Sequence, residues 1–158
     1  KSESDVVEVA GRGHAVGSLF VDPNPIELSN SALAVQRAYA DAGVGVSDIG
    51  VAEVHDCFTV TELLMMEAMG LSEQGQAGAM LKAGVTSLDG SLPINTGGGL
   101  VAFGHPVGAT GVKQVLEVFN QMKGQCGDYQ MGSHPNYGLT VNMGGDDRTT
   151  VSLVLKNG

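Results

Sequence analysis

The sequence predicts an α/β fold in which a mixed five-stranded sheet is covered by helices, with elements in the order β-α-β-α-β-α-β-β. Two observations lead to this prediction. Apolar runs with strand-like spacing alternate with stretches of helical periodicity, and two strand-like runs follow one another at the end of the chain. A chain of 158 residues with 42% hydrophobic content can bury a sizeable core, so one domain is expected over residues 1–158.

The first strand and the first helix are marked by glycine and serine. Residues 6–16 have strand-like spacing with glycine interruptions. Either Ser29 or Ser31 can cap a helix that continues through Ala42 and is closed by Gly43. These two segments begin the predicted alternation of strands and helices.

A short strand and a second helix come next. Residues 51–54 form a short run that is typical of a buried strand. Thr59 and Glu62 have the spacing of a capping box, which predicts a helix from about Val60 to Met69. A polar cluster between the strand and the helix is discussed below.

Weaker signals fill the middle of the chain, and two strands close it. A second, weaker helix is predicted over residues 73–83, and residues 93–95 lead into a glycine-rich loop. Residues 139–143 and 149–155 read as the two final strands.

One apolar stripe indicates a further helix before these strands, and this helix ends at Gly124. The stripe is expected to face the sheet. Ala109 and Val118 suggest that a second face of the same helix is buried as well. The stripe consists of Val112, Val115, Leu116, Phe119 and Met122.

The composition argues against nucleic acid and membranes as partners. The net charge is −9, whereas a protein that binds phosphate backbones needs a basic face. Aromatic residues make up 4% of the chain, which leaves little surface for stacking on single-stranded bases. No apolar run is long enough for a membrane span. Because two cysteines do not make a disulfide framework at this length, we expect a reducing compartment, with the cytoplasm as the default.

Three reactive side chains, His55, Asp56 and Cys57, stand where the short strand ends and the next helix begins. Ligands collect at the carboxyl ends of strands in α/β sheets. The positive end of a helix dipole also raises the thiolate fraction of a nearby cysteine, which suits Cys57 to giving and taking protons. The residues alone leave an alternative open, in which Cys57 is a small buried hydrophobe, His55 a satisfied polar group and Asp56 a cap.

A second motif, NTGGGLVAFGHPVGATG at residues 95–111, presents a histidine from a glycine-rich loop. Its consecutive glycines permit positive φ angles and close approach of the backbone to a ligand. Pro106 stiffens the turn beside His105. The loop is neither a P-loop nor a dinucleotide fingerprint, because no Gly-Lys-Ser/Thr follows and the glycine spacing differs.

The two motifs, HDCF at 55–58 and GHPVGATG at 104–111, resemble those of the C-terminal domain of thiolases. More narrowly, they are similar to the sterol-carrier-protein-type and archaeal acetyl-CoA acetyltransferases. The resemblance spans essentially the whole chain and includes NMGG at 142–145 before the last strand. It implies a thiolase-like half whose N-terminal partner, the half that carries the nucleophilic cysteine, lies outside residues 1–158.

The resemblance implies catalytic roles for three residues in an acyl-CoA acyltransferase. His105 matches the base that activates the nucleophilic cysteine for attack on an acyl-CoA. His55 matches a position that helps to form an oxyanion hole for the thioester enolate. Cys57 matches the second cysteine, which moves the proton at the acyl α-carbon, and Asn142 lies where better-known thiolases keep that cysteine. Asp56 is expected to be a structural cap.

The resemblance also implies a CoA thioester as the substrate, with no cofactor and no metal. Expected partners are acyl-CoA or CoA, the N-terminal thiolase half, and further copies in a homo-oligomer. Cys126 lies in a polar loop and does not fit the role of nucleophile, and residues 146–148 are expected to form a solvated turn. The expected substrate-binding residues are Asn95, Gly98, Gly99, Gly104, Asn142 and Gly144.

Three alternatives compete with this interpretation. A non-catalytic thiolase-like module for binding or assembly remains open. A retro-aldolase acting on a CoA thioester is disfavoured, because such relatives carry tyrosines at motif positions and Tyr39, Tyr129 and Tyr137 lie outside the motif loops. A zinc site built from residues 55–57 and His105 is disfavoured, because consecutive ligands make poor tetrahedral geometry.

Overall fold

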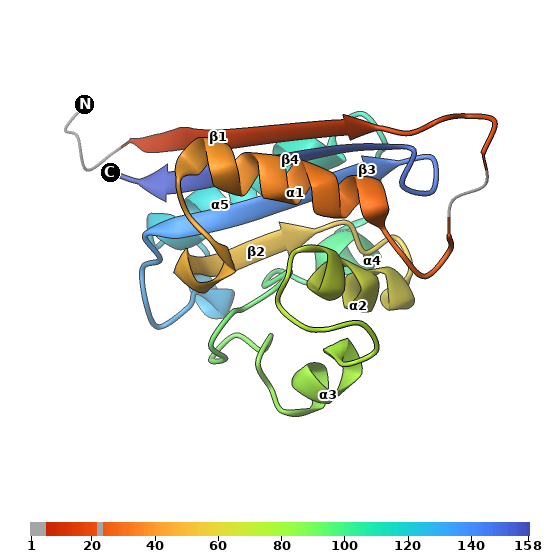
Figure 1. The fold of residues 1–158 in the computed structure, drawn as a ribbon. Coiled ribbons are helices and arrows are strands. Elements are labelled where there is room, and N and C mark those ends of the chain that lie inside the picture. The colour runs from red at the N-terminus through yellow and green to blue at the C-terminus, as the bar shows by residue number, and fades with distance from the viewer. Residues whose placement is uncertain (1–5, 22–23) are drawn as a thin grey trace.

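The computed structural model describes residues 6–21 and 24–158, which form a four-stranded mixed sheet with the strand order β1-β4-β3-β2 (Figure 1). Strand β4 runs antiparallel to both β1 and β3, and β2 runs parallel to β3. The predicted α/β class is therefore confirmed. The strands are β1 (Val7–Val16), β2 (Ile49–Val54), β3 (Tyr137–Gly144) and β4 (Thr149–Asn157).

The fifth strand expected from the sequence is reduced to a single bridge. Ile94 pairs with Ala52 in the parallel sense, and the amide of Asn95 donates to the carbonyl of Ala52 at 2.9 Å. Asn95 then takes a positive φ of 51°, which turns the chain away from the edge of the sheet. The segment therefore runs beside β2 for too short a distance to form a strand.

Helices cover both faces of this sheet. The first two, α1 and α2, pack on one face with Ala52, Val54 and Leu139, whereas α5 packs on the other face over Val51 and Leu155 (Figure 1). Within the described ranges, no helix has the length and apolarity that crossing a membrane requires. The helices are α1 (Ser29–Ala42), α2 (Thr59–Ala68), α3 (Ala77–Lys82), α4 (Gly99–Phe103) and α5 (Thr110–Met122), with short 3-10 turns at Val46–Asp48 and Gly127–Tyr129.

Helix α1 lies directly on the backbone of β1 because two glycines of that strand leave room for it. A Cβ atom at Gly13 would stand 1.8 Å from the carbonyl oxygen of Ala34, and one at Gly11 would stand 2.3 Å from that of Ala38. The glycine interruptions of the first strand therefore set the distance between the sheet and its first helix.

The N-terminus of α1 is capped by a residue from the turn between β3 and β4. The Asp147 carboxylate accepts hydrogen bonds from the backbone amides of Asn30 and Ser31 at 2.7 and 2.8 Å, and from the Ser31 hydroxyl at 2.6 Å. The expected serine cap is absent, because no side chain at the start of α1 caps the helix. The expectation of a solvated turn is also wrong for Asp147, which is only 1% exposed.

Helix α2 begins as predicted, but without the expected capping box. Phe58 occupies the N-cap position, and no side chain there bonds to the backbone of the helix. The Glu62 carboxylate instead accepts a hydrogen bond from the side-chain amide of Asn95 at 2.9 Å. Glu62 therefore bonds to Asn95 of the glycine loop and not to the first turn of its own helix.

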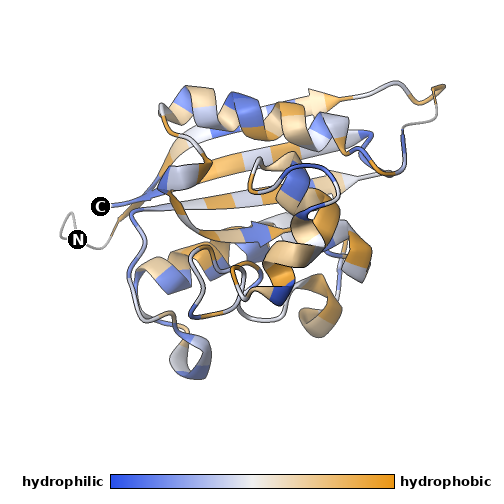
Figure 2. Cartoon of the chain, turned by 60° about the horizontal axis from the view of Figure 1, so that its bottom comes forward, coloured by the Kyte–Doolittle hydropathy of each residue, from blue (hydrophilic) through white to orange (hydrophobic). Residues whose placement is uncertain are grey.

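Helix α5 presents to the sheet only part of the predicted face, because Val118 and Met122 are buried and Val115 packs against them as expected, whereas two other residues of the stripe turn outward. Val112 and Leu116 are 65% and 52% exposed, whereas Gln114 and Gln121 are fully buried. The Gln114 amide donates to the carbonyl of Val141 in β3 at 3.2 Å. Figure 2 shows polar and apolar residues interspersed along the helices, so hydropathy alone did not identify the inner face.

Candidate active site

Three segments converge at the carboxyl ends of β2 and β3. They are the turn that follows β2, the glycine-rich loop before α5, and the end of β3, which are far apart in the sequence. Together they enclose a pocket of about 440 Å³. The pocket is lined by His55, Cys57, Phe58, His105, Val107, Asn142, Met143, Gly144, Gly145 and Asp146.

The two histidines of the sequence motifs lie side by side in this pocket. The ring centroids of His55 and His105 are 4.8 Å apart, and the rings meet edge to face at 89°. Burial lowers the pKa of His55; its hydrogen bond to Asn142 opposes this shift, and His105 adds to it. Burial therefore favours the neutral form of the His55 imidazole.

Each imidazole is held through its Nδ1 atom. Nδ1 of His55 lies 2.9 Å from Oδ1 of Asn142, and Nδ1 of His105 lies 2.7 Å from the Thr110 hydroxyl. This arrangement leaves Nε2 of each ring as the nitrogen available to a ligand. A carboxamide oxygen only accepts, so Nδ1 of His55 carries the proton here and Nε2 is an acceptor. To donate from Nε2, neutral His55 needs the Asn142 amide to present its NH₂ group instead.

Asp56 is a structural residue that holds the glycine loop. Its carboxylate accepts a hydrogen bond from the backbone amide of Leu100 at 2.7 Å, at the start of α4. A Cβ atom at Gly99 would stand 2.1 Å from this carboxylate, so only glycine allows the contact. The side chain is buried and does not line the pocket. Asp56 thus caps α4, whereas the sequence placed it next to α2.

The two cysteines occupy different environments, and both are free thiols. Cys57 is half-buried and lines the pocket just before α2. Cys126 lies outside the pocket, and burial raises its pKa to about 11, with the Glu117 carboxylate adding to the shift. Among the described residues, no three histidine, cysteine, aspartate or glutamate side chains are grouped so that they could hold a metal ion.

The predicted substrate-binding residues are divided among several places. Asn142 and Gly144 line the pocket with the histidines. Gly99 and Gly104 line a neighbouring cavity of about 250 Å³. Gly98 lines neither of these cavities and takes a φ of 98° immediately before α4.

Asn95 is turned into the protein and does not line the pocket. Its Oδ1 accepts a hydrogen bond from the Val54 amide at 2.8 Å, and its Nδ2 donates to Glu62. Both ends of the amide are thus used to fasten the glycine loop to β2 and α2. The sequence marked Asn95 through its position before the glycines, but its contacts are those of a structural residue.

Sequence reasoning missed a buried carboxyl group beside the site. Glu53 of β2, two residues before His55, is 1% exposed and lies 3.8 Å from the Lys113 ammonium. Burial raises the pKa of Glu53 to about 8, although Lys113 opposes the shift. Lys113 is also 3.8 Å from Glu117, and its Nζ lies 3.4 Å from the centre of the Phe103 ring. The sequence signal that could have revealed this group is a glutamate within an otherwise apolar strand.

Comparison with known proteins places the chain in a family. The profile of the family described as "Thiolase C-terminal domain-like" matches residues 11–157. An acetyl-CoA acetyltransferase of Methanothermobacter thermautotrophicus is 40% identical over 116 residues, which cover 73% of this chain and 30% of the relative. Sterol carrier protein 2 of Rattus norvegicus is 44% identical over 98 residues, which cover 62% of this chain and 18% of the relative.

A thiolase subunit and a solved structure extend the comparison. Benzoylsuccinyl-CoA thiolase subunit BbsB of Thauera aromatica is 36% identical over 112 residues, which cover 71% of this chain and 29% of the subunit. The structure titled "Ltp2-ChsH2(DUF35) aldolase" superposes with a TM-score of 0.78 at 24% identity, over 93% of this chain and 38% of the other. The chain thus spans less than a third of each of the three sequence relatives. With its profile match and its fold, the chain belongs to the thiolase C-terminal domain-like family.

Proposed function

We propose that this chain is the C-terminal part of a thiolase-like acyl-CoA acyltransferase, which makes or breaks a carbon–carbon bond of a 3-ketoacyl-CoA by Claisen chemistry. The observation that carries the proposal is the meeting of two imidazoles and one thiol in a single pocket at the ends of β2 and β3. The family match and the relatives named acetyl-CoA acetyltransferase support the reaction class.

In this proposal, each side chain handles one proton or one developing charge. Nε2 of His105 takes the proton of a cysteine on the N-terminal half as its sulfur attacks the thioester carbonyl. His55 stabilises the enolate oxygen from its Nε2–H tautomer. The Cys57 thiolate removes the α-proton in condensation and returns it in thiolysis. The CoA thioester is substrate, and no further cofactor is needed.

The proposal extends to partners and location. The N-terminal half supplies the nucleophile, and we expect further copies to assemble in a homo-oligomer. Reduced thiols suit the cytoplasm. The retro-aldolase alternative receives less support, because the similarity to the aldolase structure is one of fold at 24% identity and no tyrosine lines the pocket.

The experiment uses the complete protein, that is, this chain together with the N-terminal half. Cys57→Ser should still take an acyl group from acetyl-CoA, detected by mass spectrometry, but should fail to exchange the α-proton in D₂O. His105→Ala should do neither, and Cys126→Ser is the matched control that should do both. Absence of acylation in Cys57→Ser would identify Cys57 as the nucleophile, and normal turnover in His105→Ala would remove the assigned base.

A further inference from the structure

One ammonium group lies where strand β2 and helices α4 and α5 meet. Nζ of Lys113 in α5 is 3.8 Å from Oε2 of Glu53 in β2 and 3.8 Å from Oε1 of Glu117 in its own helix. The same atom lies 3.4 Å from the centre of the Phe103 ring, at the end of α4. It is shielded from solvent, although 27% of the Lys113 side chain is exposed. Its charge therefore attracts these neighbours more strongly than it would in water.

Glu53 connects this ammonium to the stretch of backbone that carries His55. Glu53 lies on the face of β2 that α5 covers, because Val51, two residues earlier, packs on that face with Val118. His55 follows two residues after Glu53, directly beyond the end of the strand. A contact that holds Glu53 against α5 thus also limits how far the backbone at His55 can move away from α5.

The loop that presents His105 is held near the same ammonium at both of its ends. Residues 104–109 join α4 to α5, and all of them are exposed. Just before this loop, the Phe103 ring contacts Lys113 and packs so close to Gly97 that an added Cβ there would stand 2.6 Å from the ring. The loop ends at Thr110, the first residue of α5, and Lys113 follows it by about one helical turn.

The placement of Thr110 decides which nitrogen of His105 is free to act as a base. The Thr110 hydroxyl donates to the carbonyl of Pro106 at 3.3 Å, so its oxygen accepts from Nδ1–H of His105 at 2.7 Å. The neutral ring then carries its lone pair on Nε2, the atom that removes a proton in the proposed function. A shift of the loop relative to α5 would break this bond and release the other tautomer.

We propose that Lys113 is a positioning residue, which sets the placement of His105 relative to His55 by joining α4 and α5 to strand β2. This inference rests on the proposed function, because it takes His105 as the base. Lys113 lines the neighbouring cavity of about 250 Å³ and not the histidine pocket. It therefore acts through the loop of His105 and not on the substrate.

The two carboxyl groups beside Lys113 differ in charge near pH 7. Burial raises the pKa of Glu53 to about 8, with Lys113 opposing the shift, so Glu53 mostly keeps its proton and the Glu117 carboxylate balances the ammonium. Removal of Lys113 alone would leave Glu117, which is 7% exposed, as an unbalanced buried charge and would destabilise the fold. Lys113→Met/Glu117→Gln removes both charges, and the new amide oxygen can still accept from the Tyr129 hydroxyl.

The test compares thiolysis by the complete protein in wild type and in this double variant. Displacement of a reacting group by about 1 Å can cost about a hundredfold in rate, so kcat should fall about tenfold to a hundredfold. KM should change less than about twofold, because Lys113 does not line the histidine pocket. Urea unfolding shows that the variant is folded. Unchanged kcat in the folded variant would overturn the role of Lys113.

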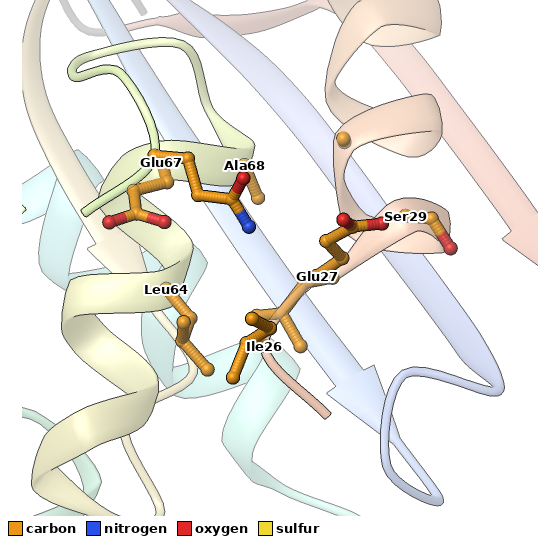
Figure 3. A pocket seen from close by; sticks show the side chains of 9 residues that line it. Ile26, Glu27, Ser29, Leu64, Glu67 and Ala68 are labelled. Atoms are coloured by element: carbon orange, nitrogen blue, oxygen red, sulfur yellow. The ribbon is translucent and has the colours of Figure 1, made fainter. Parts of the chain in front are cut away.

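Two control variants separate the ammonium from general effects of substitution. Lys113→Arg keeps the charge and can stack on the Phe103 ring, so its kcat should stay within about threefold of wild type. Lys82→Met/Glu27→Gln makes the same chemical changes at exposed positions and should behave as wild type. Lys82 ends α3, and Glu27 lies beside the groove between α1 and α2, on the face of the sheet opposite α5 (Figure 3). A loss in Lys113→Arg as large as in the uncharged variant would overturn the proposal.

A measurement that needs no activity separates this inference from the proposed function. Nitrogen NMR of the histidine rings in the complete protein reports the tautomer of His105 at a pH where the ring is neutral. Wild type and Lys113→Arg should carry the proton on Nδ1, whereas Lys113→Met/Glu117→Gln should show both tautomers. This difference in a protein without thiolysis would refute the acyltransferase and retain the role of Lys113. Thiolysis with one common tautomer in all three proteins would refute the role of Lys113 and retain the acyltransferase.

Discussion

His55 and Asn142 share a hydrogen bond of 2.9 Å, and through it the amide controls both the tautomer and the charge of the ring. Burial lowers the pKa of His55, and the bond to Asn142 holds part of that shift back. A neutral His55 ring puts no positive charge beside His105. It therefore does not oppose the proton that His105 takes from the cysteine in the proposed reaction. Asn142 is therefore a positioning residue of the proposed site.

Two different substitutions of Asn142 should move the pKa of His55 in opposite directions. Asn142→Ala removes the bond that favours the charged ring, so the pKa should fall below its wild-type value. Asn142→Asp places a negative charge beside Nδ1, so the pKa should rise by about one unit or more. Imidazole NMR signals followed against pH measure both shifts and report the tautomer. One common pKa in all three proteins would show that the amide does not control the ring.

At the scale of elements, one carboxylate joins two parts of the chain that the sequence keeps far apart. Asp147 satisfies the free backbone amides at the start of α1 from the turn between β3 and β4. Such amides have no partner inside the helix, and a negative charge there also meets the positive end of the helix dipole. The turn and the helix consequently depend on each other for stability.

Removing this carboxylate should destabilise the protein. Asp147→Ala leaves the backbone amides of Asn30 and Ser31 without an acceptor, so we expect a loss of about 2–4 kcal/mol in the free energy of unfolding. Asp146→Asn changes the neighbouring exposed residue, keeps a side chain that tolerates the φ of 52° at this position, and should cost less than about 0.5 kcal/mol. Urea unfolding of both variants measures the difference. Equal stability of the two would mean that Asp147 contributes no more than a surface residue.

Glu53 gives strand β2 a dependence on pH. Because its pKa is raised to about 8 in the folded protein, the folded state binds a proton that the unfolded chain releases near its ordinary value of 4.5. The contribution of Glu53 to stability is therefore largest below that ordinary value and is lost as the pH rises toward about 8, by at most about 1.4 kcal/mol for each unit. Glu53→Gln should remove this fall. Unfolding measured at pH 5, 6, 7 and 8 would contradict the assignment if both proteins changed alike.

The sequence predicts most elements but not the contacts that end them. Periodicity located α1, α2 and β1, because local spacing reflects which face is buried. The capping box at Thr59 failed because Asn95, distant in sequence, bonds to Glu62. The inner face of α5 was misjudged in part, because Gln114 is buried by its bond to the backbone of β3 while Val112 and Leu116 turn outward. Such pairings become visible only in three dimensions.

The sequence likewise predicted only part of the candidate site. The motif positions of His55, Cys57 and His105 could be read from the chain, and all three line one pocket. The inward turn of Asn95 could not, because it depends on which way a side chain leaves its backbone. Even the five-residue helix α4 was hidden, since glycines carry little signal for a helix.

At the scale of the whole molecule, α4 and α5 carry an outward apolar face. Phe103 and Val107 are 48% and 82% exposed, and Val112 and Leu116 continue this surface along α5. A surface of this kind usually meets a partner. In the proposed function, that partner is the N-terminal half, so the face is where we expect the two halves to pack.

The isolated 158-residue chain should therefore self-associate and lack acyl transfer. Light scattering should give a mass that increases with concentration, and added N-terminal half should restore thiolysis. Leu116→Glu places a charge in the face and should weaken both effects, whereas Leu81→Glu changes an exposed leucine on α3 and should weaken neither. A chain that stays monomeric at high concentration would contradict the exposed face, and thiolysis by the chain alone would contradict an external nucleophile.

The pairing of β1 with β4 has a practical consequence for anyone who handles this protein. Val7 lies opposite Asn157, while Val16 and Thr149 pair at the other end of the ladder (Figure 1). Gly144, which lines the pocket, pairs with Thr149 at that end. A fluorophore, an affinity handle or a fused domain attached before Val7 or after Asn157 thus emerges at the end remote from the histidines.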